Sequence, residues 1–201
     1  MQNRGRLFVF EGVDAAGKSS IAAKFTQTLQ NRGIESQILA FPGNIPRTLG
    51  QLVYKIHHGP NECGIESLTP SSLQALHIAA HLDAIETTII PSLSRGSCIV
   101  LDRYWWSTWA YGLVGGMQRG VLDALVEVER RAWGIWQPTH LFYVTRKDPL
   151  RAEPKKQWEM IKDAYKELID VENGKYPITI VENEESEIAA LDYVLSHLII
   201  R

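Results

Sequence analysis

Residues Leu7–Ile21 read LFVFEGVDAAGKSSI. The apolar run 7–10 predicts a buried strand, and a helix is expected from about residue 18 to residue 31. Between them, residues 12–19 fit G-x-x-x-x-G-K-[ST] at every fixed position. Glycines let such a loop curl so that successive main-chain N–H groups point at phosphate oxygens, and the following helix presents its positive N-terminus to the same anion. The stretch therefore predicts a phosphate-binding loop (P-loop) rather than an ordinary glycine turn.

The P-loop offers particular contacts to a nucleoside triphosphate. Lys18 can reach the β- and γ-phosphates, and the hydroxyl of Ser19 is placed to coordinate Mg²⁺. We expect ATP to be bound by a continuous run of residues, namely Gly12, Val13, Asp14, Ala15, Ala16, Gly17, Lys18, Ser19 and Ser20.

Composition narrows the class of protein. The 201 residues suffice for one α/β domain, and the net charge of −2 gives no bulk attraction to nucleic acid or to anionic membranes. Two cysteines are too few for a disulfide framework or a zinc site. No apolar run reaches transmembrane length, and the first ten residues lack a signal-peptide core. We expect a cytoplasmic protein that binds neither nucleic acid nor membranes.

Strand and helix patterns alternate along the chain. Strands are expected at 7–10, 35–41, 98–101, 139–145 and 177–181, and helices at 18–31, 48–58, 69–93, 121–132, 155–169 and 186–199. The helix at 69–93 is expected to bury an apolar stripe: Leu73, Leu76, Ala80, Ala84 and Ile85. Such alternation favours a parallel sheet covered on both faces, in a single domain over residues 1–201.

Polar residues follow the third strand, where ligands of such a sheet collect. Asp102 ends an apolar run downstream of a P-loop, which is the usual position of a second Mg²⁺ anchor. Arg103 beside it offers a planar fork for a second phosphate group. The alternative is a purely structural Asp–Arg pair.

Three stretches, FEGVDAAGKSS (10–20), LDRYWWSTWAYG (101–112) and AFPGN (40–44), together resemble the thymidylate kinase family of nucleoside monophosphate kinases. The resemblance runs through most of the chain. It implies an α/β P-loop kinase fold with a five-stranded parallel sheet in the order 2-3-1-4-5 and helices on both faces. It also implies a homodimer that uses ATP and Mg²⁺ to phosphorylate a nucleoside monophosphate, most plausibly dTMP.

The same resemblance assigns roles to individual residues. Asp14 matches the family's P-loop Asp, which approaches the sugar 3′-hydroxyl of the acceptor. Arg103 matches the Arg that grips the acceptor phosphate, and Tyr111 the Tyr that lies against the deoxyribose. Further acceptor contacts are expected from Phe41, Pro42, Arg47 and Thr108.

The sequence departs from the family at the base pocket. His77 and His81 stand where the family carries a Phe that stacks on thymine and an Arg that hydrogen-bonds it, and Gly112 stands where a Gln is common. Both imidazoles can stack or hydrogen-bond, with a charge that depends on pH. Their i, i+4 spacing also occurs in metal sites, and simple helix packing is a third interpretation. The acceptor base therefore stays open.

The second departure is the lid that follows the fourth strand. The family carries a longer arginine-bearing segment there, whereas this chain has RKDPLRAEPKK at 146–156. Because positions 15 and 16 are alanines, the P-loop supplies no extra arginine, and Arg151 of the lid is the first candidate for a catalytic cation. The expected catalytic residues are therefore Asp14, Lys18, Arg103 and Arg151. Alternatively the lid is a solvated turn, and turnover is slow or absent.

Two other functions compete with a nucleotide kinase. A deoxynucleoside kinase shares the architecture but needs a general base, and Asp102-Arg103-Tyr104 together with Asp14 argues against it. A nucleotide-binding regulator is favoured by the altered base pocket and the short lid. Three tryptophans at 105, 106 and 109 either line the acceptor pocket or pack against the long helix or a dimer partner.

Overall fold

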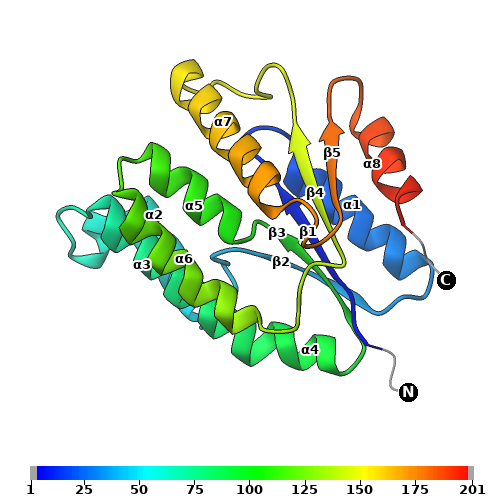
Figure 1. The fold of residues 1–201 in the computed structure, drawn as a ribbon. Coiled ribbons are helices and arrows are strands. Elements are labelled where there is room, and N and C mark those ends of the chain that lie inside the picture. Colours follow the sequence, from blue (N-terminus) through cyan, green and yellow to red (C-terminus); the bar gives the residue numbers. More distant parts are fainter. Residues whose placement is uncertain (1–3, 199–201) are drawn as a thin grey trace.

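Five strands form one parallel sheet in the computed structural model, which describes residues 4–198 (Figure 1). They are β1 (Leu7–Glu11), β2 (Ser36–Ala40), β3 (Cys98–Asp102), β4 (His140–Thr145) and β5 (Ile178–Glu182). The order β2-β3-β1-β4-β5 confirms the predicted topology. The central strand β1 pairs Phe10 with Asp102 on one side and with Phe142 on the other, and all five of its residues are buried. This is why β1 reads as an unbroken apolar run that ends in one acid.

Helices cover both faces of the sheet, as expected. Their bounds are α1 (Lys18–Asn31), α2 (Leu49–His58), α3 (Pro70–Ala84), α4 (Ile90–Ser94), α5 (Trp105–Val114), α6 (Arg119–Trp133), α7 (Lys155–Glu172) and α8 (Glu187–Ser196), with a 3-10 turn η1 (Pro60–Cys63) and a π-helical turn η2 (Ile85–Ile89). In Figure 1, α1 and α8 lie on one face, and the helices between β2 and β5 lie on the other. The predicted end of the last helix at residue 199 lies outside the described residues.

The helix predicted over 69–93 is divided. Thr69 caps α3 by accepting a hydrogen bond from the N–H of Ser72, as the sequence indicates. The π-helical turn η2 then widens the helix just before Pro91, which has no N–H to donate and whose ring crowds the carbonyl four residues earlier. Burial of Ala80 and Ile85 is confirmed. Leu73, Leu76 and Ala84 are only half-buried, because α3 packs against α2, α5 and α6 on different sides rather than along one stripe.

The segment 105–111, which has no helical pattern of apolar residues, forms most of α5. All three of its tryptophans are buried in the core. The indole N–H of Trp106 donates to Tyr176 (3.1 Å) and that of Trp109 to Asp123 (2.8 Å). The core-packing interpretation of these tryptophans is therefore the correct one. An apolar helix that is buried on almost every side shows no amphipathic period, which explains why the pattern failed to reveal it.

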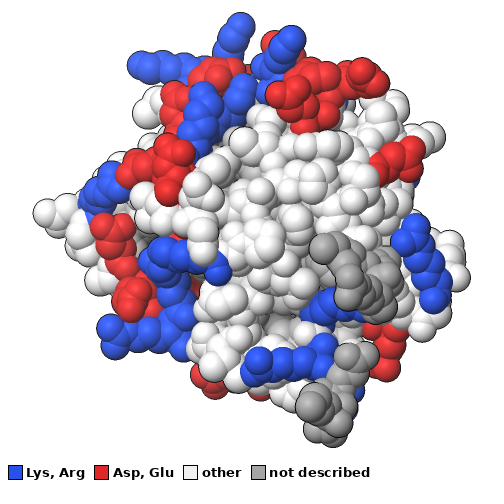
Figure 2. Space-filling view, turned by 45° about the vertical axis from the view of Figure 1, so that its right-hand side comes forward, with Lys and Arg blue, Asp and Glu red and all other residues white. Residues whose placement is uncertain are grey.

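The surface carries no broad region of one charge on the face drawn in Figure 2, where Lys and Arg alternate with Asp and Glu around a largely uncharged centre. Within residues 4–198, no helix is both long and apolar enough to cross a membrane.

Candidate active site

The P-loop is shaped by the ends of β4 and β5. At Gly12 (φ 147°) a Cβ atom would lie 2.2 Å from the carbonyl oxygen of Val144, so only glycine fits. The side-chain amide of Asn183, just after β5, donates to the carbonyl of Ala16 (2.9 Å). These contacts hold the loop in its curled form at the carboxyl edge of the sheet.

Lys18, the first residue of α1, is buried, with only 5% of its surface exposed. Its ammonium lies 3.8 Å from the Asp14 carboxylate. Burial, reinforced by the nearby charge of Arg103, lowers the pKa of Lys18 to about 8. Asp102, Asp14 and Glu11 oppose this fall without cancelling it, so the buried ammonium is well prepared to bind a phosphate.

Asp14, Arg103 and Tyr111 meet beside this lysine. The hydroxyl of Tyr111 donates to one carboxylate oxygen of Asp14 (2.7 Å) and accepts from its main-chain N–H (2.9 Å). The guanidinium of Arg103 pairs with the other oxygen and lies 5.3 Å from the centre of the Tyr111 ring. Burial alone would raise the pKa of Asp14, but Arg103 and Lys18 outweigh it and hold this pKa below its ordinary value. Residues from three separate segments thus form one charged cluster.

Asp102 and Ser19, the predicted Mg²⁺ ligands, flank the loop. Asp102 ends β3 next to Phe10, and its Oδ1 atom is buried without a hydrogen-bond partner among residues 4–198. Ser19 is exposed on the first turn of α1. A buried carboxylate oxygen that lacks a donor fits a cation, so these residues suit the predicted ion.

The two base-pocket histidines have different surroundings. His81 is buried, stacks on Phe41 with ring centres 4.0 Å apart, and places Nδ1 2.8 Å from the buried carboxylate of Glu129. Its Nε2 is buried and has no hydrogen-bond partner in the described part of the chain. His77 Nε2 lies 3.2 Å from Nδ1 of His57, which belongs to α2 rather than to a loop. Burial and the neighbouring imidazoles lower the pKa of His77 to about 3.

No group of three or more His, Cys, Asp or Glu side chains within residues 4–198 is arranged to hold a metal ion. The structure therefore gives no support to a metal site at His77 and His81.

The remaining predicted acceptor residues come from α5 and from the segment between β2 and α2. Thr108 is buried in α5, and Pro42 is half-buried after β2. Arg47 is exposed before α2, where its main-chain N–H donates to the side chain of Gln51 (3.1 Å).

The short lid is fastened to the P-loop. The main-chain N–H of Leu150 donates to the carbonyl of Ala15 (2.9 Å). Arg151 is exposed, and its Nε lies 2.9 Å from Glu153. The hydrogen bond and charge of Glu153, together with the charge of Asp14, raise the pKa of Arg151. Arg151 therefore lies within electrostatic reach of the cluster without contacting it.

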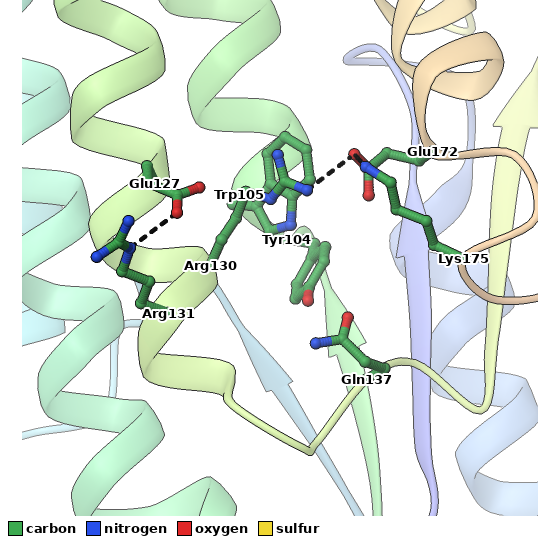
Figure 3. A pocket seen from close by; sticks show the side chains of 8 residues that line it. All are labelled: Tyr104, Trp105, Glu127, Arg130, Arg131, Gln137, Glu172 and Lys175. Carbon is green, nitrogen blue, oxygen red and sulfur yellow. Dashed lines mark hydrogen bonds and ion pairs between the residues drawn. The ribbon is translucent and has the colours of Figure 1, made fainter.

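A cavity of about 300 Å³ lies apart from the P-loop, between α5, α6 and α7 (Figure 3). Each of its cations lies beside an acid: Arg131 is 2.8 Å from Glu127, and the buried Glu172 pairs with Arg130 (3.3 Å) and accepts a hydrogen bond from Lys175 (2.7 Å). Because each charge has a partner, this cavity offers no evident anion site.

Comparison with known proteins places the chain in a family. The family model described as thymidylate kinase matches residues 10–188. The chain belongs to the thymidylate kinase family. It is 34% identical to a thymidylate kinase of Chlorobaculum parvum over 141 residues (69% of this chain, 60% of that one). It is 36% identical to one of Bordetella petrii over 148 residues (72% of this chain, 66% of that one).

The comparisons cover only part of the relatives' length, and the solved structure shares the fold at low sequence identity. The chain spans about 60% of the length of the Chlorobaculum thymidylate kinases that it matches. A crystal structure of thymidylate kinase from Ehrlichia chaffeensis has the same fold, with a TM-score of 0.79 over 96% of this chain and 98% of that one, at 17% identity.

The sequence analysis did not identify several residues that contact the predicted site residues, directly or through one another. They are Glu11, Ser107, Glu129 and Trp158. Only Glu11 gave a signal, since it is an acid that ends an apolar strand directly before the P-loop.

Proposed function

We propose that the protein transfers the γ-phosphoryl group of ATP to a nucleoside monophosphate, with dTMP as the acceptor. The observation that carries this proposal is the position of Asp14. Its carboxylate belongs to the P-loop and lies beside Lys18, yet it also contacts Arg103 and Tyr111 from the neighbouring strand and helix. A triphosphate on the loop and a monophosphate on Arg103 would therefore meet end to end.

Each residue then has a definite task. Lys18 and the N–H groups of residues 12–20 hold the triphosphate, while Ser19 and Asp102 hold Mg²⁺, which neutralises charge on the phosphates. Arg103 binds the acceptor phosphate, and Asp14 orients the sugar against Tyr111. The acceptor oxygen is already ionised, so positioning and charge neutralisation suffice and no general base is needed.

The base would enter between α2 and α3. His77 stays uncharged there because its pKa is far below neutrality. Since a carboxylate cannot donate, Nδ1 of His81 donates to Glu129, which leaves the buried Nε2 for the base edge. The proposal thus retains Phe41, His77 and His81 as base contacts, with Pro42, Arg47 and Thr108 at the margin.

A coupled ADP-release assay over nucleosides and monophosphates, with and without Mg²⁺, tests the proposal. We expect Mg²⁺-dependent turnover with dTMP and none with thymidine. Turnover with thymidine alone would identify a deoxynucleoside kinase instead. ATP binding without acceptor-dependent turnover would identify a regulator, a function favoured by the exposed, Glu153-paired state of Arg151. The proposal includes a homodimer. Light scattering coupled to size-exclusion chromatography would test it by measuring the molar mass of the protein in solution.

A further inference from the structure

Glu11 is a fully buried carboxylate at the end of β1, directly before the P-loop. One of its oxygens accepts hydrogen bonds from the main-chain N–H groups of Tyr104 (2.7 Å) and Ser107 (3.0 Å). The other accepts from the hydroxyls of Ser107 (2.8 Å) and Tyr165 (2.9 Å) and from the N–H of Gly12 (3.3 Å). One side chain thus joins the P-loop, α5 and α7.

The contacts of Glu11 make it the cap of α5. Tyr104, at the N-cap position, supplies no side-chain hydrogen bond of its own. The N–H groups of Tyr104 and Ser107 lie in the first turn, where a helix supplies no carbonyl four residues earlier, and within the helix that of Ser107 reaches only the carbonyl of Tyr104 (3.1 Å). Glu11 accepts both, and its negative charge lies at the positive end of the helix. The start of α5 is therefore fixed by a residue of another strand.

Ser107 carries this restraint on to Arg103. Its hydroxyl oxygen accepts a hydrogen bond from one terminal nitrogen of Arg103, Nη1 (2.8 Å), while its hydrogen points to Glu11. The other terminal nitrogen, Nη2, pairs with Asp14. Arg103 also has a φ of 80°, a left-handed conformation that side chains other than glycine rarely adopt. A residue in this conformation persists only where its surroundings hold it.

We propose that Glu11 is a positioning residue, which orients the guanidinium of Arg103 through Ser107 and so holds Nη2 beside Asp14, where the acceptor phosphate would bind. The inference rests on the proposed function of Arg103. It explains why a carboxylate is kept in an otherwise apolar strand. Burial of Glu11 is unfavourable and raises its pKa, although Arg103 and the hydroxyl donors work against the rise. A leucine would avoid this penalty but would leave Arg103 without its support.

Glu11→Gln tests the proposal with the smallest change of shape. The amide oxygen can still accept from the two main-chain N–H groups, whereas the NH₂ group can no longer accept from Ser107 or balance the charge of Arg103. We expect the KM for dTMP to rise about tenfold or more and the KM for ATP to change less than about twofold. Ser107→Ala, which removes the connecting hydroxyl without disturbing β1, should shift the same KM in the same direction.

Glu172→Gln is the matched control. Glu172 is also buried, with 2% exposure. It accepts hydrogen bonds from Lys175 and Tyr176 and pairs with Arg130, but no contact joins it to Arg103. Both KM values should stay unchanged in this variant. An equal rise in the dTMP KM of Glu172→Gln would show that lost stability is the cause, and would overturn the proposal.

A second readout does not depend on turnover. In the parent protein labelled with ¹⁵N-arginine, the Nη–H signals of Arg103 should be resolved and slow to exchange, because both terminal nitrogens are held. In Glu11→Gln and Ser107→Ala the guanidinium should rotate more freely, so that these signals merge and exchange faster with water. Unchanged signals in both variants would overturn the positioning role. A parent that shows resolved signals but no acceptor turnover would refute the proposed function alone.

Discussion

The main-chain oxygen of Asp14 accepts a hydrogen bond of 2.8 Å from the indole nitrogen of Trp158. The next residue of the P-loop, Ala15, accepts a second one from Leu150. The lid and the first turn of α7 are thus held against the middle of the P-loop. These two hydrogen bonds restrain the segment that carries Arg151, so a catalytic role for this residue would depend on its leaving Glu153.

Arg103→Ala should weaken use of the acceptor far more than use of ATP. The variant removes the fork that we assign to the acceptor phosphate, so kcat/KM for dTMP should fall about a hundredfold or more, with the KM for ATP within about threefold of the parent. Steady-state kinetics with each substrate varied in turn measures both. Arg131→Ala on the exposed face of α6 is the control and should leave all constants unchanged.

Lys18→Met should abolish turnover and yet make the ligand-free protein harder to unfold. The pKa of Lys18 is about 8 instead of 10.5, so the buried ammonium costs roughly 3 kcal/mol at neutral pH. Since the folded pKa is the lower one, this cost is complete below pH 8 and disappears as the pH rises toward 10.5. Urea unfolding should therefore favour the variant at neutral pH, by a margin that shrinks above pH 8. A variant less stable than the parent at neutral pH would contradict this account.

Tyr111→Phe and Tyr111→Ala separate the hydroxyl from the ring. The Phe variant loses two hydrogen bonds to Asp14, so kcat/KM for dTMP should fall about tenfold. Its ratio of activities with deoxyribo- and ribonucleotides should stay unchanged, because the ring, which we propose to lie against the sugar and to favour deoxyribonucleotides, is still present. The Ala variant should lose that preference as well. Equal preferences in both variants would remove the ring from the sugar site.

Arg151→Ala tests whether the short lid takes part in catalysis. If Arg151 leaves Glu153 to stabilise the transferring phosphoryl group, kcat should fall about ten- to a hundredfold while the KM for ATP changes little. Lys156→Ala, in the first turn of α7, serves as the control. An unchanged kcat for Arg151→Ala would assign no catalytic cation to this position.

The P-loop and the alternation of strands and helices were predictable because their signals are local, whereas the strand order followed from the family resemblance. Residues 12–19 carry their chemistry in one continuous motif, and alternating strands and helices at this length leave few arrangements of a parallel sheet. The partners of the site residues were not predictable in this way. Glu129 reaches His81 across 48 positions, and Glu11 reaches Ser107 across 96. Such contacts depend on how α5 and α6 pack, and the fully buried α5 showed no helical period at all.

The left-handed backbone conformation of Arg103 lowers the stability of the fold at a position where the proposed activity needs a guanidinium. Glycine adopts a φ of 80° without steric cost, so Arg103→Gly should unfold at a higher denaturant concentration than Arg103→Ala. The free energy of unfolding of the Gly variant should be larger by about 1 kcal/mol. Both variants lack the guanidinium equally, and only the backbone separates them. Because the residue that suits this turn best has no side chain, the protein tolerates a conformational penalty here and keeps a charge at the point where we propose that the two substrates meet.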